Sequence, residues 1–189
     1  MSLWYRFVCA VCGFWFRITH HAVCVEGRER LPEGAAILCP NHTSLRDPVY
    51  LAVACGGEMP LRFMAKAELF RVPVVNRVVK SLGAYPVRRG EADMDSIRES
   101  MSILRTGGKL LIFPEGTRVT AGKDVEAKAG AAFLAAHTGA PLVPVRIENA
   151  RTYFRPVRVV FGEPIAVRGR RAAQNEAAAQ VMRAIGELA

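Results

Sequence analysis

A histidine and an aspartate five positions apart form the first candidate catalytic pair in this 189-residue sequence. His42 and Asp47 follow the apolar run Ala35–Cys39, and Pro48 comes directly after the aspartate. An aspartate that caps a helix, with proline at the first helical position, would bend the chain so that the two side chains meet. The carboxylate would then orient the imidazole and make it more basic. A structural histidine beside a capping aspartate explains the same residues equally well, so both interpretations stay open here.

Two further polar segments follow short apolar runs. Pro114–Arg118 comes after Leu110–Phe113 and contains a glycine that lets a ligand approach the backbone, a threonine hydroxyl, and an arginine suited to phosphate. Arg88 and Arg89 follow the run Tyr85–Val87. The segment Pro114–Arg118 also fits an ordinary Pro-Gly turn with surface charges. Because open α/β sheets bind ligands at the carboxyl ends of their strands, we expect both segments to lie near the histidine.

The elements that must position these residues are short strands alternating with helices. The predicted strands are Ala22–Val25, Ala35–Cys39, Leu61–Ala65, Tyr85–Val87, Leu110–Phe113, Leu142–Val145 and Val157–Phe161. Periodic apolar residues predict helices over Met94–Leu104, Ala127–His137 and Val181–Leu188. Continuous apolar strands are buried on both faces, and this length suits one domain. The sequence therefore predicts a single α/β domain with a central, mostly parallel or mixed sheet of about seven strands flanked by helices.

The N-terminal run Leu3–Ile18 is rich in aromatic residues and has Arg6 and Arg17 near its ends. It is shorter than the roughly 20 apolar residues of a membrane-spanning helix. No small-residue cleavage site follows it, which argues against a signal peptide. Aromatic residues with flanking arginine are typical of an amphipathic helix at the membrane interface, and an ordinary core helix is the alternative.

The formal net charge of +9 predicts an anionic partner: nucleic acid, anionic lipid or a phosphorylated metabolite. The basic residues gather in two segments, Arg62–Arg89 and Arg146–Arg171. No nucleic-acid-binding motif accompanies them.

The five cysteines are an odd number, which favours a reducing cytosol over a disulfide framework. We interpret Cys9 and Cys12 as small buried apolar residues rather than zinc ligands, because no second pair completes a site.

Four blocks in this order resemble the glycerolipid acyltransferase family, whose best-known bacterial member acylates 1-acylglycerol 3-phosphate. The blocks are Asn41–Asp47 (Asn-His-x-x-x-x-Asp), Gly83 with Arg89, Phe113–Arg118 (Phe-Pro-Glu-Gly-Thr-Arg), and the proline-rich strand Ala140–Val145. The resemblance extends from about Val25 to Ile165. The departures from the family pattern are Asn76, Arg88 and Val119, none of which replaces a residue with an assigned chemical role. The last block fits either the wall of an acyl pocket or a plain core strand.

The resemblance implies a role for each site residue. His42 would remove the proton of a glycerol hydroxyl while that oxygen attacks an acyl thioester, and Asp47 would hold the imidazole and stabilise its cation. The residues implied to bind substrate are Asn41, Lys66, Arg89, Glu115, Gly116, Thr117 and Arg118, with the two arginines on the phosphate. No metal and no cofactor are implied beyond the thioester co-substrate, which is acyl-CoA or acyl carrier protein.

The implied reaction moves a fatty acyl group to the free sn-2 hydroxyl of 1-acylglycerol 3-phosphate and gives phosphatidic acid for phospholipid biosynthesis. Residues 1–21 would form an interfacial helix and residues 22–189 the acyltransferase domain. The expected partners are lysophosphatidic acid, the thioester and an anionic membrane surface, with no nucleic acid, at the cytoplasmic face of the cell membrane. The alternatives are another glycerol-phosphate or lysophospholipid acceptor, or a basic membrane- or nucleic-acid-binding protein without catalysis.

Overall fold

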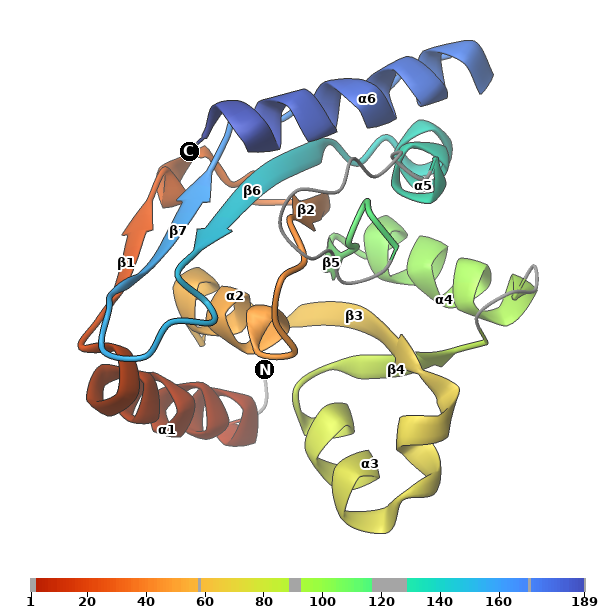
Figure 1. Ribbon diagram of the computed structural model, residues 1–189. Coiled ribbons are helices and arrows are strands. Elements are labelled where there is room, and N and C mark those ends of the chain that lie inside the picture. The colour runs from red at the N-terminus through yellow and green to blue at the C-terminus, as the bar shows by residue number, and fades with distance from the viewer. Residues whose placement is uncertain (1–2, 58, 89–92, 117–128, 170, 189) are drawn as a thin grey trace.

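A seven-stranded sheet runs through the described part of the chain and carries helices on both faces (Figure 1). The computed structural model describes residues 3–57, 59–88, 93–116, 129–169 and 171–188. The strands are β1 (Val23–Glu26), β2 (Ala36–Pro40), β3 (Leu61–Lys66), β4 (Ala84–Val87), β5 (Lys109–Leu111), β6 (Leu142–Glu148) and β7 (Val157–Phe161). The helices are α1 (Leu3–His20), α2 (Asp47–Cys55), α3 (Pro73–Ser81), α4 (Met94–Arg105), α5 (Gly130–Thr138) and α6 (Arg171–Glu187), with 3-10 helices η1 (Arg28–Arg30) and η2 (Ala67–Arg71).

The strand order across the sheet is β1-β7-β6-β2-β5-β3-β4. Neighbouring strands pair in parallel except β6 and β7, which are antiparallel. The predicted α/β class and mixed seven-stranded sheet are therefore confirmed. Five strands, β6, β2, β5, β3 and β4, end at the same edge of the sheet, and β2 lies between β5 and β6. Segments that follow these strands are consequently brought together at one edge.

Burial on both faces explains why the strands are continuous apolar runs. All five residues of β2 are buried. Its Ile37 packs with the helices α4, α5 and α6, while the next residue, Leu38, packs with α1 and α2. Successive side chains of a strand point to opposite faces, so each face needs its own apolar residues. Complete burial of each such side chain contributes about 1.5–3 kcal/mol, which makes the sheet the rigid base of the site.

Most differences from the predicted elements lie at their ends. α4 begins where the carboxylate of Asp93 accepts the backbone N–H of Ser96 at 3.2 Å, and it ends before Gly107, as predicted. β6 extends to Glu148, beyond the predicted end at Val145, because antiparallel pairing with β7 satisfies the backbone of these extra residues. α6 begins at Arg171, earlier than its apolar stripe indicated. The predicted start of α5, residue 127, lies outside the described residues.

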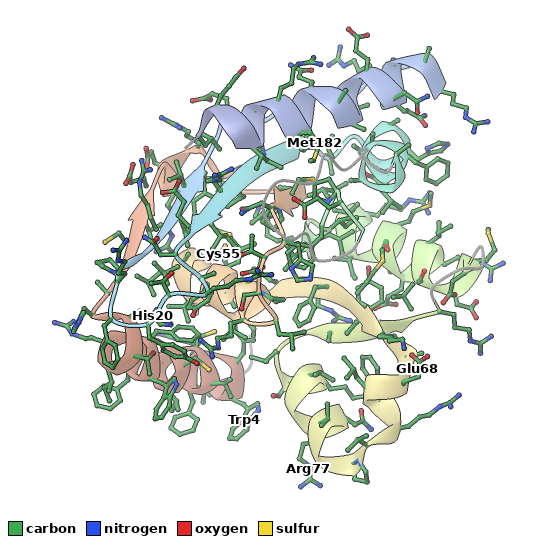
Figure 2. The ribbon with its side chains drawn as sticks, in the orientation of Figure 1. Trp4, His20, Cys55, Glu68, Arg77 and Met182 are labelled. Atoms are coloured by element: carbon green, nitrogen blue, oxygen red, sulfur yellow. The ribbon has the colours of Figure 1, made fainter. Side chains whose placement is uncertain are left out.

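The N-terminal helix α1 has one side buried in the domain and one side that exposes apolar residues. Tyr5, Cys9 and Phe16 are buried, and the helix packs against α2. Its opposite side exposes large apolar side chains: Leu3, Trp4, Phe7, Val11, Phe14, Trp15 and Ile18. Figure 2 shows Trp4 at the outer surface and His20 at the end of the helix that meets the domain. Among the described residues, no helix combines the length and apolarity needed to cross a bilayer.

Candidate active site

The histidine and the aspartate of the first block meet at the carboxyl edge of the sheet. The chain leaves β2 at Pro40 and turns through residues 41–46 into α2, and the Nδ1 of His42 lies 3.0 Å from the Oδ2 of Asp47. Asp47 is fully buried and His42 nearly so. The prediction that Asp47 caps the helix is wrong, because Asp47 is the first residue of α2. Its Oδ2 instead accepts the backbone N–H groups of Thr43 and Ser44, each at 2.7 Å.

These contacts decide which nitrogen of the imidazole carries the proton. A carboxylate only accepts hydrogen bonds, so the Nδ1 of His42 must be the donor to Asp47. The other ring nitrogen, Nε2, then keeps its lone pair and is the basic atom. The two backbone N–H groups that donate to Asp47 hold its carboxylate in a fixed position. The pair therefore has the arrangement of an oriented general base.

The segment after β5 supports the histidine from its other side. The ring of Phe113 stacks on the imidazole of His42, with ring centroids 3.7 Å apart and an angle of 21° between the planes. The buried carboxylate of Glu115 accepts the backbone N–H of His42 at 3.1 Å through Oε2. Burial raises the pKa of Glu115, and this hydrogen bond partly offsets the increase. The first and third sequence blocks thus form one site.

Asn41 binds the neighbouring strand through both ends of its amide. Its Nδ2 donates to the carbonyl of Ile147 at 3.0 Å, and its Oδ1 accepts the backbone N–H of Ile147 at 2.7 Å. The amide therefore fixes the histidine-bearing turn to β6. The sequence placed Asn41 among the substrate-binding residues, and no pattern in a single sequence reveals that a side chain binds a strand 106 positions away.

An apolar cavity of about 330 Å³ opens beside His42. Its volume lies within the range of small-molecule sites, roughly 300–1,000 Å³. Gly116, which has a φ of 69°, lines the cavity together with His42. The large apolar side chains around it come from β3, β4, β5 and the segment after β5, and from the helices α4 and α5: Met64, Val87, Leu111, Ile112, Phe113, Ile97, Phe133 and Leu134. Sequence reasoning did not identify the helical residues, because periodicity marks an apolar face without showing that the face borders a cavity.

The structure describes only some of the remaining predicted residues. Lys66, at the end of β3, is more than half exposed and pairs with Glu68 at 3.3 Å. Gly83 has a φ of 89°, and a side chain there would collide with the carbonyl of Leu61, which explains why the second block begins with glycine. The predicted positions Arg89, Thr117 and Arg118 lie outside the described residues. The fourth block forms β6, whose Leu142, Val143 and Val145 are core residues and not among those that line the cavity.

The five cysteines are all free thiols, and Cys12, which was predicted to be buried, is half-buried. Cys9, Cys39 and Cys55 are buried, and burial raises the pKa of each thiol, to about 12 for Cys39 and Cys55. Buried thiols of this kind behave as small apolar side chains. Within the part of the chain that the structure describes, no three histidine, cysteine or acidic side chains are grouped to hold a metal ion.

The fold and this site together define an α/β protein in which a carboxylate-oriented histidine lines an apolar cavity. The family model described as Acyltransferase matches residues 22–148. The chain belongs to this family, which confirms the resemblance seen in the four blocks.

Named relatives agree with this assignment. The chain is 33% identical over 150 residues to the 1-acyl-sn-glycerol-3-phosphate acyltransferase of Bacillus subtilis, which covers 75% of this chain and 72% of that protein. A chloroplastic 1-acyl-sn-glycerol-3-phosphate acyltransferase of Arabidopsis thaliana is 31% identical over 127 residues, covering 65% of this chain. The chain spans only about a third of that plant protein, since the match covers 35% of it.

A solved structure shows the same fold. The crystal structure of the 1-acyl-sn-glycerophosphate (LPA) acyltransferase PlsC from Thermotoga maritima superposes with a TM-score of 0.72 and is 27% identical in sequence. The likeness covers 97% of this chain and 80% of the Thermotoga chain. It therefore includes α1 as well as the sheet.

Proposed function

We propose that this protein transfers a fatty acyl group from a thioester to the free hydroxyl of 1-acylglycerol 3-phosphate. The observation that carries the proposal is the His42–Asp47 pair, 3.0 Å apart, beside an apolar cavity in a chain of the Acyltransferase family. The names of the Bacillus subtilis and Thermotoga maritima proteins support this acceptor. The product would be phosphatidic acid.

The proposed reaction follows from the hydrogen bonds of His42 and Asp47. The hydroxyl of the acceptor approaches Nε2 of His42, gives up its proton to that nitrogen, and its oxygen forms a bond to the thioester carbonyl carbon. The tetrahedral intermediate then collapses, the carbon–sulfur bond breaks, and the imidazolium returns the proton to the leaving sulfur. The carboxylate of Asp47 stabilises the imidazolium between these steps. General-base help of this kind is typically worth ~100- to 10,000-fold in rate.

The cavity supports a role in holding the fatty acyl chain. Its walls are mostly apolar and His42 lines it, so an alkyl chain inside it would leave a carbonyl near the base. Burying each methylene contributes about 0.8 kcal/mol. We propose that Arg89 and Arg118 bind the phosphate of the acceptor and that Lys66 adds to the positive potential there, in keeping with the sequence blocks that contain them.

The exposed apolar face of α1 supports attachment to a membrane surface. Trp4, Phe7, Phe14 and Trp15 are all more than half exposed, and the helix ends in Arg17 and His20. An amphipathic helix with this composition lies in the interface and is attracted further by anionic lipids. We propose that the protein acts at the cytoplasmic membrane face, where both lysophosphatidic acid and an acyl thioester are accessible.

The test is a substrate matrix with purified protein. Acyl-CoA and acyl carrier protein donors are each offered with 1-acylglycerol 3-phosphate and with glycerol 3-phosphate, and the ester product is quantified. We expect transfer to 1-acylglycerol 3-phosphate and its loss in His42→Ala. Full activity of His42→Ala would contradict the mechanism. Failure of every phosphorylated acceptor would contradict the substrate class.

A further inference from the structure

The loop between β6 and β7, residues 149–156, joins the active-site turn to the N-terminal helix. The Nε–H of Arg151 donates to the carbonyl of Thr43 at 2.6 Å, and Thr43 follows the proposed base directly. The backbone N–H of Phe154 donates to the carbonyl of Thr19, in the last turn of α1, at 2.8 Å. Figure 1 shows the loop passing close to α1 and to the start of α2. A partner that binds this loop is therefore linked, through Arg151, to the turn that carries His42.

Phe154 combines two features that are unfavourable in an isolated protein. Its φ is 59°, in the left-handed region that residues with a bulky ring rarely adopt. Its side chain is also 71% exposed to water. The nearest described ring is that of His21, with centroids 6.0 Å apart, which leaves most of the phenyl surface uncovered. Backbone strain and exposed apolar surface gather at binding sites, so this residue points to a partner outside the chain.

The neighbours of Phe154 extend the exposed surface toward the site. The ring of Tyr153 stacks on the fully buried His20, with centroids 5.5 Å apart, and the guanidinium of Arg46 lies 4.6 Å over the same ring. Leu45, within the active-site turn, is 74% exposed. The loop is thus firmly held while its apolar surface faces water. We call these residues the loop patch: Leu45, Arg46, Arg151, Tyr153, Phe154 and Arg155.

The composition and position of the loop patch favour an anionic lipid surface over a protein partner. Exposed aromatic rings mixed with arginine are typical of the membrane–water interface, and residues 149–156 contain no acid. The patch is continuous with the exposed face of α1, because Ile18 lies next to the Thr19 that binds Phe154. An acidic protein would use the arginines, but it would not need one apolar surface extending over both the helix and the loop.

We propose that the loop patch is a second point of contact with anionic lipid headgroups, separate from α1. The inference rests on the membrane attachment proposed above for α1. The apolar face of a single interfacial helix sets which side of the protein faces the lipid, but it still allows the domain to rock about the helix axis. A second contact away from the axis removes this freedom and holds the His42 turn against the lipid surface. Two contacts on one rigid body also bind more tightly than either contact alone.

The experiment measures cosedimentation of the full chain with vesicles of phosphatidylcholine, with and without phosphatidylglycerol. Phe154→Asn removes the ring, and asparagine accepts the left-handed backbone, so this variant is expected to unfold at the same or a higher temperature. We expect it to bind anionic vesicles about tenfold more weakly, since partial burial of one aromatic ring is lost. Arg155→Glu should weaken binding roughly fivefold or more in low salt. The control is Arg183→Glu on α6, on the opposite side of the molecule from α1 (Figure 1).

Wild-type affinity in both loop variants, with intact folding, would overturn the inference. The inference would also be overturned if Arg155→Glu bound vesicles as well as the wild-type protein does but lost acyl transfer only with acyl carrier protein as donor. The loop patch would then bind an acidic protein. Vesicle binding is measured without turnover, so it is independent of the proposed reaction. Absence of acyl transfer by the wild-type protein would contradict the proposed function and leave the vesicle result standing.

Discussion

Asp47→Asn isolates the contribution of the carboxylate, because asparagine has nearly the same shape. In the wild-type protein the Oδ2 of Asp47 accepts three hydrogen bonds, from Nδ1 of His42 at 3.0 Å and from two backbone N–H groups at 2.7 Å. An amide oxygen can keep the backbone bonds, but it carries no charge to stabilise the imidazolium. When the amide presents its NH₂ group to the ring instead, it favours the tautomer in which Nε2 holds the proton and is no longer a base.

The expected loss in kcat is roughly 1,000- to 10,000-fold, by analogy with the same substitution in a serine protease triad. This corresponds to about 4–5.5 kcal/mol of activation free energy. The KM for the acceptor should change little, since the carboxylate is fully buried behind the imidazole and does not face the cavity. The assay is initial-rate kinetics with 1-acylglycerol 3-phosphate, accompanied by thermal unfolding of each variant.

The matched control is Asp95→Asn, which removes a carboxylate that is 90% exposed in its side chain and pairs with Arg98 on the surface of α4. Exposed ion pairs contribute about 0–1 kcal/mol, so this control should keep both activity and stability. A folded Asp47→Asn enzyme with more than about a tenth of wild-type kcat would refute the assignment of the carboxylate, because positioned base catalysis is worth at least ~100-fold.

Three further predictions concern the frame of the site and the cavity. Asn41→Ala should lower the free energy of unfolding by about 2–4 kcal/mol, because it leaves two buried backbone groups of Ile147 without partners; urea unfolding measures this. Glu115→Gln keeps an acceptor for the N–H of His42 and removes a carboxyl whose pKa burial has raised. Since a raised pKa makes ionisation unfavourable in the folded state, the variant should be more stable than wild type at neutral pH. The difference should shrink as the pH falls below the raised pKa of Glu115 and should be absent below the ordinary glutamate pKa. Equal stability at all pH values would contradict this. Ile97→Trp should narrow the cavity and shift preference toward shorter acyl donors in a competition assay; an unchanged preference would place the chain elsewhere.

The parts of the fold that follow from local sequence were predictable. The strands could be identified because each is a short apolar run, and α4 because Asp93 and Gly107 mark its two ends. The end of β6 was not predictable, since Arg146 and Glu148 interrupt the apolar pattern and only pairing with β7 makes them part of the strand. The local apolar pattern therefore identifies a strand or helix, and pairing with neighbouring strands determines where a strand ends.

In the site, too, local sequence predicted some features, while contacts between distant positions determined others. The contact between His42 and Asp47 was predicted from their spacing and residue types. The predicted backbone geometry was wrong, because Asp47 is the first residue of α2 and does not cap it. The roles of Asn41 and Glu115 were not apparent, because each binds a backbone group that is distant in sequence. Phe133 could not be assigned to the cavity either, because its exposure depends on how α5 packs on the sheet.

These hydrogen bonds join residues that are far apart in the sequence, and this affects how the protein folds during its synthesis. The turn that holds His42 is anchored by Glu115, 73 positions further on, and by Ile147, 106 positions beyond Asn41. Contacts between such distant positions form late, since the intervening chain must be ordered first. A ribosome adds residues in order, so a nascent chain exposes the apolar α1 face long before β6 emerges. With α1 attached to a membrane as proposed above, the growing chain would reach a lipid surface while the His42 turn is still unanchored, and the proposed activity would begin only when β6 has joined the sheet.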